Sequence, residues 1–234
     1  MSAQKRQKLD RDRSLSVRAA VPGDANSIAV VHAAAARDAY RDLMPREYLT
    51  RWDLESLREV WNLIPADTDW PRRGTFVAED NGQIVGFVRI GPASHDDASE
   101  DVGAVKALYV LSEMWGMGAG RVLMQQAVAT LREAHFNEAT LWVLGANARA
   151  RRFYEAAGWF VDGTERTDEL RGFPVREIRY RCLLGQTVAV EPGLSGEARG
   201  NEASTTHPRA DVGRGLSEQV SAVDEPPPMR EYEP

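Results

Sequence analysis

Three glycines lie at alternate positions in the stretch WGMGAGRVLM (115–124), at 116, 118 and 120, directly before an apolar run. A turn of this kind before a helix presents free backbone N–H groups and the positive helix end in the same direction. Glycine also lets the backbone approach a ligand that a Cβ would hold away. The chemistry that this pattern favours is anion binding, with a phosphate or diphosphate as the natural ligand. The alternative is a flexible turn that binds nothing.

The familiar nucleotide-binding motifs do not fit this stretch. A P-loop ends in Gly-Lys-Ser/Thr, whereas Gly120 is followed by Arg121 and Val122. A dinucleotide fingerprint spaces its glycines G-x-G-x-x-G in an early strand–helix–strand unit, and here the spacing is G-x-G-x-G in mid-chain. The residues alone therefore indicate an anion without naming it.

The elements that must position this loop alternate between helix and strand. Asn81-Gly82 separates two apolar runs and predicts a tight hairpin. Apolar residues at helical spacing predict helices over 22–40 and 45–64. Strands are predicted before the loop at 15–20, 75–80, 83–90 and 103–111.

The chain after the loop continues the alternation. A helix around 123–131 is followed by a strand at 138–144 and by a short helix at 148–157, which Gly158 ends. Two further strands are predicted at 159–161 and 174–184. This order predicts an α/β fold with a mixed, mostly antiparallel twisted sheet flanked by helices.

Composition and charge limit the classes of protein to which the chain can belong. The 234 residues are 43% hydrophobic, which is enough for a core, and the net charge of −6 gives no indication of nucleic-acid binding. The one cysteine, Cys182, excludes a disulfide within the chain. No apolar stretch approaches the roughly 18 residues of a membrane span. We expect a cytoplasmic protein with a disordered basic segment at 1–14, one domain at 15–184 and a disordered acidic Gly/Pro-rich tail at 185–234.

Two segments carry a family resemblance: LYVLSEMWGMGAGRVLM (108–124) and LWVLGANARARRFYEAAGW (141–159). Together they resemble the GNAT superfamily of N-acetyltransferases. The first is similar to its R/Q-x-x-G-x-G/A loop after the fourth strand, and the second to its N-x-x-A-x-x-x-Y-E-x-x-G-F-like segment. The segments at 17–40 and 77–90 resemble the family's first strand and helix and its second and third strands, so the likeness covers roughly 15–184. It implies a GNAT-like fold and acyl transfer from acetyl-CoA to an amine.

The resemblance also implies roles for individual residues. The pantetheine arm of acetyl-CoA would pair with the end of the fourth strand, and its diphosphate would lie on the loop amides. Asn147 would contact the cofactor arm, and Tyr154 would protonate the departing thiolate, since a thiol pKa near ~8.5 and a tyrosine pKa near ~10 are compatible. The matching cofactor-binding residues are Leu108, Tyr109, Val110, Gly116, Met117, Gly118, Ala119, Gly120, Arg121 and Asn147.

Structural alternatives exist for two of these residues. Asn147 directly precedes a predicted helix and is a good N-cap residue. Tyr154, with Phe153, could simply form the core face of a short helix. Binding and capping are compatible for Asn147, so both stay open.

The sequence departs from the family pattern at three positions. Trp115 stands where Arg or Gln is usual, which weakens side-chain support for the phosphates. Ala104 and Trp142 occupy positions where some members carry a basic glutamate. No general base is therefore assigned, and a water chain is the alternative to a carboxylate at a strand end. The candidate carboxylates are Glu79, Asp80, Glu100 and Asp101.

Other polar residues give weaker signals. The acidic loop HDDASED (95–101) either attracts a cationic acceptor or is merely solvated. His95 has no partner at metal-ligand spacing and His32 is interpreted as structural, so no metal is expected. Cys182 has no catalytic-looking histidine nearby, which favours direct transfer over an acyl-cysteine. The segment 40–44 is expected on the acceptor side.

The resulting hypothesis is an acetyl-CoA-dependent N-acetyltransferase that moves an acetyl group directly to a primary amine of a small molecule or peptide. One alternative is a non-catalytic acyl-CoA-binding or sensing module, which the missing base favours. Another is a phosphate-binding interaction domain without CoA. A homodimer is possible, and neither a nucleic-acid nor a membrane partner is expected. Fold-level likeness does not name the acceptor.

Overall fold

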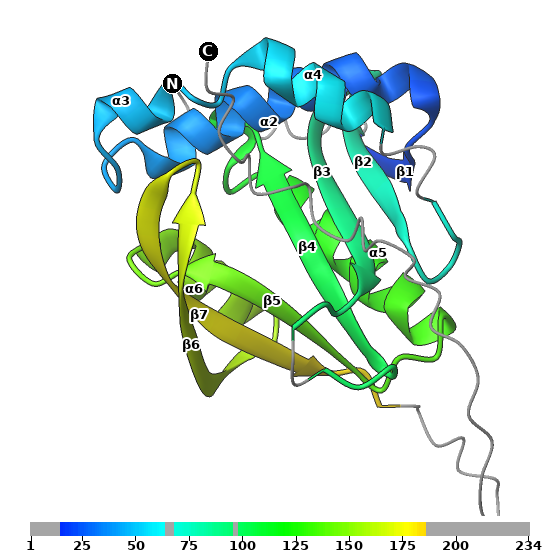
Figure 1. The fold of residues 1–234 in the computed structure, drawn as a ribbon. Coiled ribbons are helices and arrows are strands. Elements are labelled where there is room, and N and C mark those ends of the chain that lie inside the picture. Colours follow the sequence, from blue (N-terminus) through cyan, green and yellow to red (C-terminus); the bar gives the residue numbers. More distant parts are fainter. Residues whose placement is uncertain (1–14, 64–67, 96–97, 186–234) are drawn as a thin grey trace, which may run out of the picture.

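The computed structural model describes residues 15–63, 68–95 and 98–185 (Figure 1). The expected basic segment at 1–14 lies outside the described residues, and so does the expected tail at 185–234 apart from Gly185. The predicted disorder of both ends therefore stays a prediction. Within the described part, helices and strands follow each other in nearly the order that the sequence predicts.

A seven-stranded sheet in the order β1-β2-β3-β4-β5-β7-β6 forms the centre of the molecule. Every neighbouring pair is antiparallel except β4 and β5, which are parallel. The sheet is therefore mixed and mostly antiparallel, as predicted. Its strands are β1 (Leu15–Ala19), β2 (Gly74–Asp80), β3 (Gln83–Pro92), β4 (Val102–Val110), β5 (Glu138–Leu144), β6 (Phe160–Leu170) and β7 (Phe173–Leu183).

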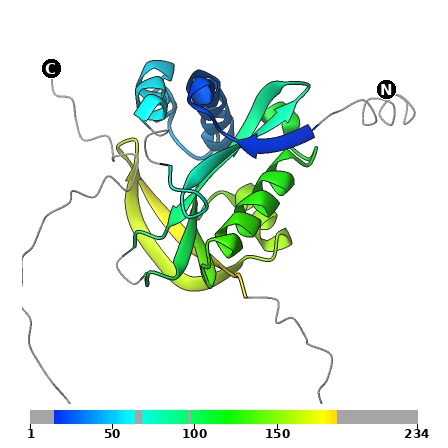
Figure 2. The ribbon, with the colours of Figure 1, turned by 90° about the vertical axis from the view of Figure 1, so that its right-hand side faces the viewer.

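Helices cover both faces of the sheet (Figures 1 and 2). Because strand side chains alternate between faces, neighbouring residues of β2 and β3 enter different cores. Phe76 and Val88 pack with α5, whereas Val77 and Phe87 pack with α2 and α4. The helical segments are η1 (Pro22–Asp24), α2 (Ala25–Tyr40), α3 (Arg46–Leu49), α4 (Leu54–Leu63), η3 (Ser112–Met114), α5 (Ala119–Glu133) and α6 (Ala148–Ala156).

The single helix predicted for 45–64 is wrong, because the chain forms two helices there. The break lies between α3 and α4, where the Asp53 carboxylate accepts hydrogen bonds from the backbone N–H (2.9 Å) and the hydroxyl (2.5 Å) of Ser56. An aspartate in this position starts a new helix. The sequence predicts one apolar side made of Leu49, Trp52, Leu57 and Trp61. This side survives the break, since the last three are buried and Leu49 packs, partly buried, against the same core.

The strand predicted at 159–161 is longer than expected. β6 continues to Leu170 and turns into β7 through Arg171 and Gly172, whose φ values are 55° and 72°. The hairpin predicted at Asn81-Gly82 has the same backbone form, with φ values of 52° and 78°. β6 is an edge strand with largely exposed, charged side chains, so it carries no apolar pattern that would predict it.

Arg18 ties the first strand to the sheet and to the start of α2. Its guanidinium donates to both carboxylate oxygens of Asp24, at 2.6 and 3.0 Å, and to Glu79 of β2, at 2.6 and 3.0 Å. Asp24 is buried and also accepts the backbone N–H of Val21 at 2.8 Å. One cation thus neutralises two carboxylates at this corner.

We expect Asp24→Asn to lower the free energy of unfolding at neutral pH by about 1–2 kcal/mol, because Arg18 loses one of its two carboxylate partners. The pKa of Asp24 lies below the ordinary 3.8 chiefly because Arg18 donates to it. Its contribution is therefore complete above the ordinary pKa and is lost as the pH falls through the lower folded pKa. Urea denaturation should show a constant gap between the two proteins from about pH 7 to about pH 4, closing below that. A gap that widens on acidification would contradict this account.

Candidate functional site

The site begins where β4 and β5 part. In the described chain these strands pair at three register positions only, Val102 with Glu138, Gly103 with Ala139 and Ala104 with Thr140. Beyond them β4 follows β3 and β5 follows β7, so the two strands diverge (Figure 1). Backbone N–H and C=O groups alternate in direction along a strand, so each strand presents polar backbone groups to the gap.

A cavity of about 2260 Å³ occupies this gap. Its walls come from α2, α4, β4, the glycine loop, β5, α6 and the β6–β7 hairpin. Ordinary small-molecule pockets are roughly 300–1,000 Å³. The cavity is therefore large enough for two ligands at once.

The glycine loop lies at one end of this cavity, and its glycines have two different roles. Gly116 and Gly118 have φ values of +77° and +95°, which disfavour any residue with a Cβ. Gly118 is the N-cap of α5, whereas Gly120 already lies within the helix, facing the Phe153 ring of α6. Ala119 is fully buried. The loop residues that line the cavity are Gly116, Met117, Gly118, Gly120 and Arg121.

The predicted strand residues Leu108, Tyr109 and Val110 also line the cavity. The Tyr109 hydroxyl lies 3.3 Å from the Tyr40 hydroxyl of α2. The carbonyl of Val110 already accepts a hydrogen bond of 2.9 Å from the indole of Trp115. The indole thus satisfies one backbone acceptor at the end of β4.

Asn147 is the N-cap of α6, as the structural alternative predicts. Its side-chain oxygen accepts the backbone N–H of Ala150 at 3.1 Å. It also lines the cavity. Capping fixes the position of this amide beside the gap, so its role toward a ligand stays a prediction.

Tyr154 lines the same cavity and is buried within the core that packs against α5. Burial, and secondarily Tyr109, raise the pKa of its phenol well above the ordinary value. The phenol therefore keeps its proton at neutral pH, and its role as the acid stays a prediction. The packing role is confirmed, since the same residue is buried near the rings of Phe153 and Tyr180.

The sequence analysis did not predict an aromatic cluster that joins α2 and α4 to the sheet. Its members are His32, Trp61, Phe87 and Tyr109. His32 of α2 accepts a hydrogen bond of 3.2 Å from the Trp61 indole and lies with its ring centroid 4.4 Å from that of Tyr109. Burial, and secondarily Arg171, lower the pKa of His32 to about 3. It is a neutral packing residue, in line with the structural interpretation. Helical spacing predicts the buried face of α2 but not which strand residue it meets.

The candidate bases at the strand ends lie elsewhere. Glu79 accepts from Arg18, and Asp101 accepts from Ser99 and Asn137. Neither lines the cavity, nor do Asp80 and Glu100. Ala104 and Trp142 do line it, so the two positions that hold a glutamate in some family members face the cavity without one.

Among the described residues, seven carboxylates line the cavity instead. Glu177 of β7 has a side chain that is 15% exposed and accepts from the Arg166 guanidinium at 2.8 and 2.9 Å. Arg166 in turn lies over the ring of Trp142, 4.4 Å from its centroid. The full set is Asp38, Asp42, Asp53, Glu59, Asp168, Glu169 and Glu177. Sequence spacing could not find it, because its members come from α2, α4, β6, β7 and the connection between α2 and α4.

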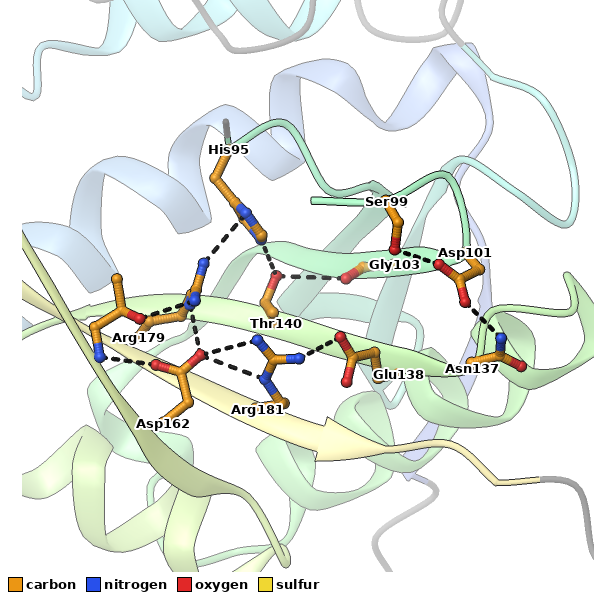
Figure 3. Close-up of polar contacts among 11 residues, drawn as sticks. His95, Ser99, Asp101, Gly103, Asn137, Glu138, Thr140, Asp162, Arg179 and Arg181 are labelled. Atoms are coloured by element: carbon orange, nitrogen blue, oxygen red, sulfur yellow. Dashed lines mark hydrogen bonds and ion pairs between the residues drawn. The ribbon is translucent and has the colours of Figure 1, made fainter. Parts of the chain in front are cut away.

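His95 belongs to a polar network on the sheet (Figure 3). Arg179, 3% exposed, donates to Asp162 at 2.6 Å and approaches His95 Nδ1 at 3.2 Å. A guanidinium only donates, so Nδ1 accepts and the ring proton lies on Nε2, 3.2 Å from the Thr140 hydroxyl. The lone pair of His95 is therefore already engaged. In the part of the chain that the structure describes, no group of three or more His, Cys, Asp and Glu is arranged to hold a metal ion.

The remaining sequence candidates are Cys182 and the segment 40–44, and they lie in different places. Cys182 of β7 is half-buried, burial raises the pKa of its thiol, and it does not line the cavity. In the segment 40–44, Tyr40, Asp42 and Leu43 line the cavity. None of the described helices is both long and apolar enough to cross a membrane.

Comparison with known proteins identifies the arrangement. Residues 37–159 match the family model described as the acetyltransferase (GNAT) family. The chain belongs to this family. The resemblance seen in the sequence is thereby confirmed, and the protein is an acyltransferase of the GNAT type.

Individual relatives agree with this assignment. The chain is 30% identical over 143 residues to an uncharacterized N-acetyltransferase, YuaI, of Bacillus subtilis, covering 61% of this chain and 78% of the relative. The fold of the present chain is similar to that of the PaiA N-acetyltransferase of Thermoplasma acidophilum in complex with coenzyme A. The TM-score is 0.55 at 18% identity, and the match covers 70% of this chain and 98% of the PaiA chain. The fold is also similar to the ribosomal-protein-S18-alanine N-acetyltransferase of Escherichia coli (TM-score 0.53, 15% identity, 76% and 99%). The predicted GNAT-like fold is confirmed.

The two kinds of glycine in the loop lead to a prediction. Gly118→Ala should lower the free energy of unfolding by about 1 kcal/mol, because it forces a Cβ into left-handed backbone. Gly120→Ala should leave stability unchanged or raise it, because its helical Cβ would meet the Phe153 ring at an ordinary 3.4 Å. Urea denaturation of both variants checks this. Equal losses would show that the loop does not have this backbone.

Proposed function

We propose that this GNAT protein transfers the acetyl group of acetyl-CoA directly to a primary amine of a small molecule or peptide. One observation carries the proposal: a single cavity contains the glycine loop at one end, the β4 edge along its wall and a buried, protonated tyrosine, Tyr154, beside it. These are the groups that a diphosphate, an amide-containing arm and a departing thiolate require. The family assignment and a relative's complex with coenzyme A support the same cofactor.

In this proposal the cofactor lies along β4. The backbone of Leu108, Tyr109 and Val110 pairs with the pantetheine arm, and Asn147 contacts the arm from the start of α6. The amides of the loop from Gly116 to Arg121 receive the diphosphate. Two features of the structure support the last assignment: the positive φ values of Gly116 and Gly118, and the beginning of a 15-residue helix at Ala119.

The reaction follows from these positions. The ammonium ion of the acceptor first gives one proton to water in the cavity. The resulting neutral amine attacks the thioester carbonyl, a C–N bond forms and the C–S bond breaks. The departing thiolate takes the phenolic proton of Tyr154, and the extra amine proton passes to water in the cavity. The tyrosinate then recovers a proton from solvent. Because the pKa of Tyr154 is raised, the phenol remains protonated across the working pH range.

The acceptor side carries the carboxylates. They come from α2, from the connection between α2 and α4, from α4, and from β6 and β7. Three arginines, Arg51, Arg166 and Arg171, line the same walls, but the carboxylates outnumber them. A cluster of this sign raises the local concentration of cations, and an amine approaches as an ammonium ion. Both small amines and a peptide amino terminus fit this chemistry. The Escherichia coli neighbour, by its name, acts on an alanine of a ribosomal protein.

The proposed cofactor can be tested by binding. A calorimetric titration of the full chain with acetyl-CoA should show one binding event, and ADP should bind at least tenfold more weakly because it lacks the arm that pairs with β4. Equal binding of ADP would favour a phosphate-binding domain over an acetyltransferase. Tight acetyl-CoA binding without thiol release over a broad amine panel would favour the non-catalytic acyl-CoA module.

The proposed general acid, Tyr154, can be tested by removing its hydroxyl. Tyr154→Phe should lower kcat by about 10²–10⁴-fold while leaving the dissociation constant of acetyl-CoA unchanged, because only the proton donor is removed. Tyr180→Phe is the matched control, since its ring centroid lies 5.9 Å from that of Tyr154 and it does not line the cavity. Thiol release measures kcat. Unchanged turnover in Tyr154→Phe would remove this residue from the mechanism.

A further inference from the structure

Trp115 and Arg149 form a stacked pair at the cofactor end of the cavity. The Arg149 guanidinium carbon lies 3.2 Å from the centroid of the Trp115 ring. The indole is itself held in place, because its N–H donates to the Val110 carbonyl at 2.9 Å. Arg149 comes from the first turn of α6, next to Asn147, and both members of the pair line the cavity. The pair therefore joins α6 to the glycine loop through a fixed aromatic platform.

Two segments of the chain bring only positive charge to the cavity among their described residues. The segment from η3 into α5 and the segment that contains α6 contribute Arg121 and Arg149 as their charged cavity residues, and the cavity carboxylates come from other elements. Arg121 points back toward the loop, since its Nη2 lies 3.7 Å from the position that a Cβ on Gly118 would take. Two guanidinium groups thus flank the backbone that is proposed to receive phosphate.

Among the described residues, Arg149 contacts the Trp115 ring, and no described carboxylate forms an ion pair with it. Burial, and then the neighbouring Arg152, lower the pKa of Arg149. Stacking on a ring uses the face of the guanidinium and leaves its N–H edge available, and that edge matches phosphate oxygens.

We infer that Arg149, held on the Trp115 ring, binds the diphosphate of acetyl-CoA together with the amides of the glycine loop. The inference rests on the proposed function and deepens it. Trp115 stands where the family resemblance expects Arg or Gln, so the loop lacks a polar side chain at that position. Arg149 supplies a cation there from a different element, and the tryptophan acts as its support.

The test is equilibrium binding to the full chain with three ligands. Arg149→Met keeps the aliphatic stem and removes the charge, so it should raise the dissociation constant of acetyl-CoA about tenfold, the effect of one lost charge-assisted contact. Acetyl-3′-dephospho-CoA should show the same rise, because its diphosphate is intact. S-acetyl-pantetheine, which has no phosphate, should bind the wild type and the variant equally.

Arg152→Met is the matched control, because it removes the same charge from the same helix at a position that does not line the cavity. It should change acetyl-CoA binding less than threefold. Equal binding of acetyl-CoA to the wild type and Arg149→Met would overturn the inference. A rise that disappears with the 3′-dephospho ligand would overturn the diphosphate assignment and place the contact at the 3′-phosphate.

Trp115 variants test the support. Trp115→Phe retains a ring and should bind acetyl-CoA nearly as well as the wild type, whereas Trp115→Leu should lose about as much affinity as Arg149→Met. The double variant Trp115→Leu/Arg149→Met should then bind acetyl-CoA only slightly more weakly than Trp115→Leu. Fully additive losses of affinity would contradict the platform. Arg149 lies on the surface, so its variant carries the test even if Trp115→Leu is unstable. Failure of the wild type to bind acetyl-CoA would instead defeat the proposed function.

Discussion

The short parallel contact between β4 and β5 is the constraint on which the rest of the structure depends. Three register pairs join the two halves of the sheet, and each strand then follows its own antiparallel neighbour. A parallel neighbour requires a crossover, and α5 supplies it. Sheet twist separates strands that are not paired, and the irregular register at Arg89 and Ile90 of β3 adds to the local twist. The cavity follows from this divergence, and the crossover places the beginning of α5 at its end.

The two cores make this divergence stable. One packs α5 against one face of the sheet, and the other packs α2 and α4 against the opposite face. Each half of the sheet is thus covered without closing the gap. The network of His95, Thr140, Arg179 and Asp162 holds the connection after β3 against β5 and β7, near the point where β4 and β5 still pair (Figure 3). Burying the Arg179–Asp162 ion pair costs desolvation energy. The hydrogen bonds from Arg179 to Asp162, His95 and Thr164 offset this cost.

The sequence predicts those parts of the protein whose signal is local. The hairpin at Asn81-Gly82, the strand at 138–144 and the cap at Asn147 are each fixed by neighbouring residues, and all three are confirmed. The break before α4 was missed because Asp53 competes with helical spacing that continues on both sides of it. Most of β6 lies beyond the strand predicted at 159–161, because an exposed edge strand needs no apolar alternation. Pairs such as Trp115 with Arg149 join residues 34 positions apart and become visible only when α6 lies beside the loop.

The distribution of charge gives the cavity a direction. Among the described cavity residues, the glycine loop and α6 contribute Arg121 and Arg149. The walls from α2, α4 and the β6–β7 hairpin carry seven carboxylates and three arginines and are net negative, so an anionic cofactor and a cationic acceptor are drawn to different parts of the cavity. Tyr154 also lines the cavity, with its ring near Tyr180 of β7, and burial raises the pKa of its phenol. Burial keeps this phenol protonated but makes it a weaker acid than an exposed tyrosine, so on the proposed mechanism transfer to the thiolate is completed by reprotonation of the tyrosinate from solvent. The one cysteine, Cys182, does not line the cavity, and this favours direct transfer between two ligands bound together over an acyl-cysteine intermediate.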